Sequence, residues 1–150
     1  MFPSIEACAE RIRAAVEVAK ALPFDFTITA RADNFFRGNT DLDDTIARLL
    51  AYGDAGADVV YAPAVVKPDA IKAIVGATKK PVNVLAGIGG NKLTVNDYKE
   101  IGVRRITIGS ALWAVAYQAA KDAATTLLND GSFEGFDNRM AYVDALKLYS

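Results

Sequence analysis

Arginine and acidic side chains dominate the chemistry open to this chain, because its 150 residues include no histidine. Without histidine the chain alone can form no Ser-His-Asp triad, Cys-His pair or histidine metal site. Acid–base work would fall to aspartate, glutamate, lysine, tyrosine or Cys8. Arg31 and Asp33 stand out, since they follow the apolar run Phe24–Ala30. A guanidinium suits two-point capture of a carboxylate or phosphonate, so Arg31 is the first candidate ligand residue.

These residues also have structural interpretations. Arg31 could instead form a rim ion pair with Asp33 or Asp58, and Asp33 could orient Arg31 or cap a helix. The acidic stretch Asp41–Asp44 resembles a cation site, but negative charge is also favoured at the start of a helix. We interpret the stretch as a helix start and expect no metal site in this chain.

Short apolar strands alternate with helices along the chain. We expect strands at 24–30, 58–62, 81–86 and 104–108, and helices at 4–22, 41–54, 68–78, 94–101, 109–129 and 139–148. Ser4 is placed to cap the first helix. The strand markers Phe26, Val59, Val82 and Arg105 are separated by 33, 23 and 23 residues. This rhythm predicts parallel strands joined by right-handed crossovers, with helices on their outer face.

Four such units fit either a small open doubly wound sheet or half of a (β/α)8 barrel. A dinucleotide site would want G-x-G-x-x-G between strand and helix, whereas Gly87–Asn91 reads GIGGN. In a barrel, Asn83, Gly87 and Ser110 are candidate ligand contacts, and phosphate often binds between the last two loops. Alternatively, Asn83 bonds a neighbouring strand or helix, and Ser110 only caps the last helix.

Composition excludes several function classes. A net charge of −1 gives no basic field for nucleic acid or anionic lipid. No apolar run approaches the roughly 20 residues that span a bilayer, and the charged segment 1–20 is unlike a signal peptide. The single cysteine, Cys8, allows no internal disulfide and favours a reducing, cytoplasmic location.

Four segments, in their order and spacing, resemble a known family. They read FTITARADNFFRG, DLDDTIARLLAYGDAGADVVYAP, KPVNVLAGIGG and GVRRITIGSALWAVAYQAA. Together they resemble the second half of barrels in the isocitrate lyase/phosphoenolpyruvate mutase superfamily. The resemblance implies an α/β fold of four consecutive parallel βα units, corresponding to strands five to eight of a (β/α)8 TIM barrel. It also implies one partial barrel domain over residues 1–150, with a C-terminal tail at 130–150.

The resemblance implies a Mg²⁺-dependent C–C lyase or P–C mutase that acts on small 2-oxo or dicarboxylic acids. The family's matching arginine contacts the substrate's acidic group, so we expect substrate binding by Arg31 with Asp33, Asn83, Gly87 and Ser110. The family's metal-anchoring carboxylates follow strands two to four, and its catalytic cysteine loop precedes the ARxD strand. Neither region is present, so we assign no catalytic residue and expect the chain alone to be inactive.

A half barrel has two open strand edges and one uncovered sheet face, which favour association. We therefore expect a homo-oligomer or a complementary N-terminal half, and exposed C-terminal residues such as Leu146 and Tyr149 would suit a neighbouring subunit. The other expected partner is a small carboxylic acid, with no nucleic acid and no membrane. The alternative function is a non-catalytic half barrel that serves as an assembly or binding module.

Overall fold

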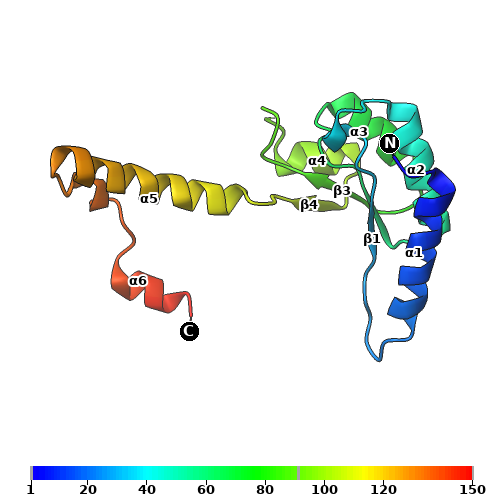
Figure 1. The fold of residues 1–150 in the computed structure, drawn as a ribbon, viewed down its shortest axis with the longest axis horizontal. Helices are drawn as coiled ribbons and strands as arrows, with labels where there is room; N and C mark the ends of the chain where they lie inside the picture. The colour runs from blue at the N-terminus through cyan, green and yellow to red at the C-terminus, as the bar shows by residue number, and fades with distance from the viewer. Residues whose placement is uncertain (1, 91, 150) are drawn as a thin grey trace. The chain divides into compact units, whose positions relative to one another are not determined.

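A computed structural model of the chain describes residues 2–90 and 92–149, so Asn91 of the glycine-rich loop lies outside the described residues (Figure 1). The chain divides into two compact units, which meet in sequence at Gly109 and Ser110. The first unit contains α1 (Ile5–Lys20), β1 (Thr29–Arg31), the 3-10 turn η1 (Phe35–Arg37), α2 (Leu42–Asp54), β2 (Val59–Tyr61), α3 (Pro68–Ala77), β3 (Val82–Leu85), α4 (Val95–Ile101) and β4 (Arg105–Thr107). The second contains α5 (Ala111–Asp130), the 3-10 turn η2 (Glu134–Phe136) and α6 (Tyr142–Lys147).

The four strands form one parallel sheet in the order β1-β2-β3-β4. This confirms the predicted fold class and topology, an α/β half barrel of four consecutive parallel units. The first strand is shorter than predicted and begins at Thr29 rather than Phe24. A strand needs a partner, and β2 offers one only from Val59 onward; before it, the carbonyl of Ile28 accepts from the backbone N–H groups of Asp58 and Val59.

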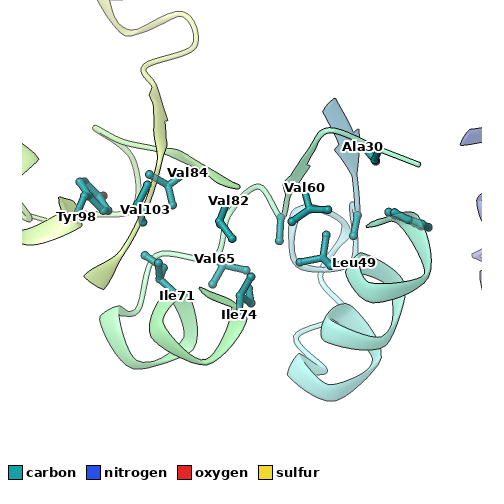
Figure 2. Close-up of a cluster of buried hydrophobic side chains, with 14 residues drawn as sticks. Ala30, Leu49, Val60, Val65, Ile71, Ile74, Val82, Val84, Tyr98 and Val103 are labelled. Atoms are coloured by element: carbon teal, nitrogen blue, oxygen red, sulfur yellow. The ribbon is translucent and has the colours of Figure 1, made fainter. Parts of the chain in front are cut away.

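One face of the sheet packs under the helices and forms the hydrophobic core (Figure 2). Apolar strand residues meet apolar helix residues there; the cluster includes Ala30, Val60, Val82, Val84, Leu49, Ile71 and Ile74, all buried. Burying one such Val, Leu or Ile side chain stabilises the fold by about 1.5–3 kcal/mol. This face therefore holds the first unit together.

Helix starts follow the chemistry predicted from the sequence. The Ser4 hydroxyl accepts the backbone N–H of Ala7 at 3.2 Å, which confirms Ser4 as the cap of α1. The Asp41 carboxylate accepts the backbone N–H of Asp44 at 3.0 Å, so the acidic stretch starts α2 as expected. Such caps are worth about 1 kcal/mol each and fix where the chain leaves a loop.

Helix α1 packs against α2 at a position that requires glycine. Gly56, just after α2, has φ 105°, and a Cβ there would lie 3.0 Å from Cγ1 of Val16. Both the left-handed backbone and the close approach of α1 exclude a side chain. Glycine at position 56 therefore allows α1 to pack closely against the end of α2.

The second unit is a long helix followed by two short ones. Gly131, with φ 66°, ends α5, and the turn η2 folds back so that Gly135 lies against the backbone of Ala123. The helix predicted at 139–148 is observed as α6. In the described part of the chain, no helix is long and apolar enough to cross a membrane.

Candidate functional site

The carboxyl ends of all four strands lie on one edge of the sheet, because the strands are parallel. In (β/α)8 enzymes this edge carries the ligand-binding loops. Arg31 is the last residue of β1 and Tyr61 the last of β2, and the two are paired in register. The predicted ligand residue Arg31 thus stands where a barrel places its functional groups.

A row of four side chains crosses the sheet on the face away from the core. Register pairs Arg31 with Tyr61, Tyr61 with Asn83, and Asn83 with Arg105. Paired residues point to the same face, and Val84, next to Asn83, belongs to the core on the other face. By this alternation the inner face, as we call it, consists of Thr29, Arg31, Val59, Tyr61, Asn83, Leu85, Arg105 and Thr107.

Arg31 is held from three sides but keeps its terminal nitrogens free. Its Nε donates to Oδ1 of Asp33 at 2.5 Å, and its Cζ lies 5.2 Å and 5.6 Å from the ring centroids of Phe36 and Tyr61. Asp58, the other predicted partner, instead accepts a backbone N–H at 2.8 Å. Among residues 2–90 and 92–149, no group bonds the two Nη atoms of Arg31. Two parallel donors are what a bidentate carboxylate needs.

Asn83 lies at the centre of the row and has an unmet acceptor. It is 2% exposed, and its Nδ2 donates to Oγ1 of Thr107 at 3.2 Å. The Thr107 hydroxyl in turn donates to the carbonyl of Val84 at 3.0 Å. Oδ1 of Asn83 is buried without a hydrogen-bond partner in the described part of the chain. The neighbouring strand thus satisfies the Nδ2 group of Asn83, as one interpretation of the sequence expected. Oδ1 stays available to a hydrogen-bond donor, as the ligand interpretation requires.

The hydroxyl of Tyr61 is a donor at neutral pH. Burial raises the pKa of Tyr61, the positive charge of Arg31 partly offsets that rise, and the negative charge of Asp33 adds to it. The row therefore offers a guanidinium, a phenol and an amide side by side, which is a set suited to an oxygen-rich anion.

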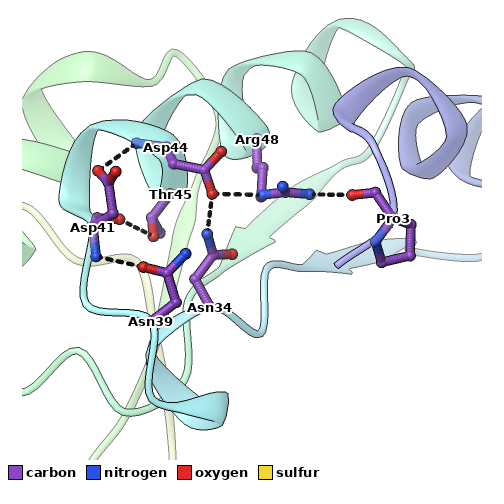
Figure 3. A network of polar contacts seen from close by, with 7 residues as sticks. All are labelled: Pro3, Asn34, Asn39, Asp41, Asp44, Thr45 and Arg48. Atoms are coloured by element: carbon purple, nitrogen blue, oxygen red, sulfur yellow. Dashed lines mark hydrogen bonds and ion pairs between the residues drawn. The ribbon is translucent and has the colours of Figure 1, made fainter. Parts of the chain in front are cut away.

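A buried polar network fixes the loop that follows Arg31 (Figure 3). Arg48, 8% exposed, donates from Nε to Oδ2 of Asp44 at 2.9 Å and from Nη1 to the carbonyl of Pro3 at 3.0 Å. The same Asp44 oxygen accepts from Nδ2 of Asn34, which is also buried. The hydrogen bond with Asp44 raises the pKa of Arg48, so the network keeps its charge. One helix thus ties the loop to the N-terminal segment.

The two predicted loop contacts lie in different units. Gly87, with φ 77°, follows β3, and a Cβ there would meet no atom within 4 Å. Ser110 stands at the N-cap of α5, as the helix-cap interpretation expected, but its side chain makes no capping hydrogen bond in the described residues. The predicted ligand contacts of both residues stay predictions.

Sequence reasoning missed Arg105, Phe36 and the role of Arg48. Arg104 and Arg105 are adjacent, and only the alternation of Arg105, Ile106 and Thr107 across the two faces indicates which arginine points inward. Phe36 gave no signal, because its contact with the Arg31 guanidinium depends on the course of a loop.

The fold is half of a parallel (β/α)8 barrel, and its carboxyl edge presents Arg31 beside Tyr61. Residues 1–128 match the sequence family described as phosphoenolpyruvate phosphomutase. The chain belongs to this family, within the phosphoenolpyruvate mutase/isocitrate lyase superfamily, which confirms the resemblance. A search of curated proteins finds no match.

Solved structures show the same architecture. A candidate lyase/mutase from Burkholderia cenocepacia J2315 is 44% identical, with a TM-score of 0.94 over 99% of this chain and 54% of its own. A candidate phosphonomutase from the same organism is 32% identical, with a TM-score of 0.75 over 83% of this chain and 53% of its own. An oxaloacetate acetylhydrolase bound to 3,3-difluorooxalacetate is 28% identical, with a TM-score of 0.83 over 99% and 50%. The chain therefore spans about half the length of these proteins.

Proposed function

We propose that this chain is the strand-five-to-eight half of a Mg²⁺-dependent lyase or mutase that acts on small 2-oxo or dicarboxylic acids. Its family, and the names of the similar lyase/mutase, phosphonomutase and oxaloacetate acetylhydrolase, support C–C or P–C bond chemistry. Residues 1–150 would act as one partial barrel domain, with 130–150 as a tail toward a neighbouring subunit. The single cysteine is in keeping with a cytoplasmic enzyme.

The observation that carries this proposal is the free pair of Arg31 Nη atoms at the carboxyl end of β1. Asp33 holds Nε and two rings flank the guanidinium, so the side chain is oriented before a ligand arrives. Prior orientation reduces the entropy lost on binding. We assign the substrate carboxylate to Arg31, and further contacts to Asn83, Gly87 and Ser110.

The metal in this proposal needs ligands from elsewhere. Residues 2–90 and 92–149 contain no group of three or more acidic, histidine or cysteine side chains able to hold an ion. Mg²⁺ prefers oxygen ligands, including one or two carboxylates. We therefore assign its ligands to the half that completes the barrel, and expect this chain alone to show no turnover.

The test is Mg²⁺-dependent turnover with and without a completing half. The first half of the Burkholderia lyase/mutase is a suitable complement, because this chain resembles the second half of that protein. Oxaloacetate and methylisocitrate would be offered, and pyruvate, oxalate and acetate measured against a Mg²⁺-only blank, since oxaloacetate decays spontaneously. We expect turnover only with both halves and Mg²⁺.

Two results would count against the proposal. Mg²⁺-dependent turnover by the pure 150-residue chain would contradict its inactivity and would direct attention to Asp33 or Asp58 as an unforeseen metal site. A 1:1 complex without turnover on any substrate would favour the alternative, a non-catalytic half barrel that serves in assembly or binding.

A further inference from the structure

The inner face of the sheet carries a charge that no described residue neutralises. Of its two arginines, Arg31 is paired with Asp33. Arg105 is exposed, and in the described residues no carboxylate lies within ion-pair distance of it. Its Nη1 instead reaches from β4 to β1 and donates to Oγ1 of Thr29 at 3.3 Å. Arg105 thus extends over the inner face between the two outermost strands.

Closing the sheet into a barrel would bury Arg105. Side chains that point into a (β/α)8 barrel form packed layers of four, each contributed by alternate strands. A guanidinium in such a layer loses its water, and a buried charge is tolerated only when it is paired and hydrogen-bonded. The Thr29 hydroxyl is one neutral acceptor, so the layer needs an anionic partner from the other side of the barrel.

A second copy of this chain cannot supply that partner. Two four-stranded halves related by a two-fold axis along the barrel place equivalent strands four positions apart. Strands four apart contribute to the same layer, so the two Arg105 side chains would meet near the axis. Like charges brought together away from water repel strongly. The only carboxylate within ion-pair distance of an inner-face arginine in the described residues, Asp33, is already bonded to Arg31.

We propose that Arg105 selects what completes the barrel: it disfavours a second copy and favours a four-stranded βα half that presents a carboxylate in its layer. The completing half can belong to the same polypeptide or to another. This inference rests on the proposal that the sheet is completed into a barrel. It concerns assembly alone, so it can fail while the substrate role of Arg31 stands.

The test uses this chain as its own partner. In an equimolar mixture of wild type and Arg105→Glu, the new carboxylate meets Arg105 of the other copy in one layer. We expect a 1:1 heterodimer whose Kd is at least about tenfold lower than the Kd of the homodimer formed by either protein alone. The reason is that charge complementarity of a desolvated pair governs partner choice. Labelling one protein with ¹⁵N distinguishes heterodimer from homodimer in native mass spectrometry, and sedimentation equilibrium gives the constants.

Arg104→Glu is the matched control. It makes the same change in net charge one residue earlier, on the opposite face of the strand. Its mixture with wild type should associate no more than wild type alone. The inference is overturned if this mixture dimerises as tightly as the Arg105→Glu mixture, or if wild type alone dimerises as tightly as either.

A neutral variant keeps the test decisive if Arg105→Glu does not fold. Arg105→Gln removes the repulsion between two copies without adding an acid. We expect it to self-associate at least about threefold more tightly than wild type, since like-charge repulsion is what disfavours the pair. Equal self-association of Arg105→Gln and wild type would overturn the role of the charge.

Discussion

The two faces of the sheet differ in how completely their side chains are satisfied. On the helix-facing side, Val60, Val82 and Val84 are buried in a cluster of predominantly apolar side chains. On the inner face, one residue away along the same strands, the Nη atoms of Arg31, Oδ1 of Asn83 and the charge of Arg105 have no hydrogen-bonded or ion-paired acid or donor partner among residues 2–90 and 92–149, apart from the neutral Thr29 hydroxyl at Arg105.

This difference separates residues that stabilise the fold from residues whose partners would come from the proposed ligand or completing half. An apolar face is stable by itself, because burial needs no specific partner atom. Polar groups on a face destined for burial need defined partners. The helix side should therefore govern the stability of the isolated chain, and the inner face its ligands and its assembly.

The largest expected effect is on stability and compares one leucine on each side. Leu49 on α2 is 1% exposed in the core, whereas Leu85 is only partly buried on the inner face. Leu49→Ala should lower the free energy of unfolding by about 2–5 kcal/mol, and Leu85→Ala by less than about 1 kcal/mol. Urea unfolding followed by circular dichroism measures both. Equal losses would mean that the inner face is already covered in solution.

The next effect is on catalysis. In the completed barrel, Arg31→Ala should lower kcat/KM by about a hundredfold or more, equal to about 2.7 kcal/mol, because it removes a charge-assisted bidentate contact. Arg31→Lys keeps the charge but loses the paired donors, so it should also be strongly impaired.

The rival explanation for Arg31 is a rim ion pair with Asp33. It predicts that Arg31→Ala and Asp33→Ala lower the melting temperature together and leave kcat/KM nearly unchanged. Measuring stability and kinetics on the same variants decides between the two, and lost stability with intact kinetics would reject the ligand role.

A pH effect of intermediate size belongs to the helix side. Burial raises the pKa of Tyr52 on α2 to about 12, chiefly by desolvation, with a contribution from the hydrogen bond to Cys8. A folded pKa above the unfolded value of about 10 gives stability that is full below pH 10 and is lost as pH rises toward 12. The loss should reach about 1.4 kcal/mol by pH 11. Urea unfolding at pH 9, 10 and 11 should show this slope in wild type and a flatter one in Tyr52→Phe.

Topology was predictable from sequence because spacing and apolar runs determine it locally. The 33-, 23- and 23-residue intervals predicted parallel strands, and the family resemblance added their sequence order. The start of β1 was not predictable, since Phe26 has the residue type of a strand but lies outside the strand pairing, which begins at Thr29.

The site was predictable only in part. The sequence offered Asp33 and Asp58 as ion-pair partners of Arg31, and Asp33 is the one observed; the ligand role of Arg31 stays a prediction. The contact of Arg48 with Pro3, 45 residues away, and that of Arg105 with Thr29, 76 residues away, depend on tertiary folding. No local pattern encodes such distances, which is why the network around Asn34 and the inner-face charge emerged only from the structure.

The smallest expected effect has the most informative sign. Asn83→Leu removes a buried amide whose Oδ1 has no partner in the described residues and whose Nδ2 has one. An unmet buried acceptor costs about 1–3 kcal/mol and one hydrogen bond contributes about 1 kcal/mol, so the isolated chain should be unchanged or stabilised by up to about 2 kcal/mol. The neighbouring change Val84→Asn places an amide among the apolar side chains on the helix side. It should lower the free energy of unfolding by at least about 2 kcal/mol. Thermal and urea unfolding compare the two variants.

In the completed barrel, Asn83→Leu should nevertheless raise KM, because the donor that bonds Oδ1 of Asn83 would come from the ligand. A large loss of stability in the isolated Asn83→Leu chain would instead show that the amide serves the fold, and that the two faces are less distinct than their burial indicates.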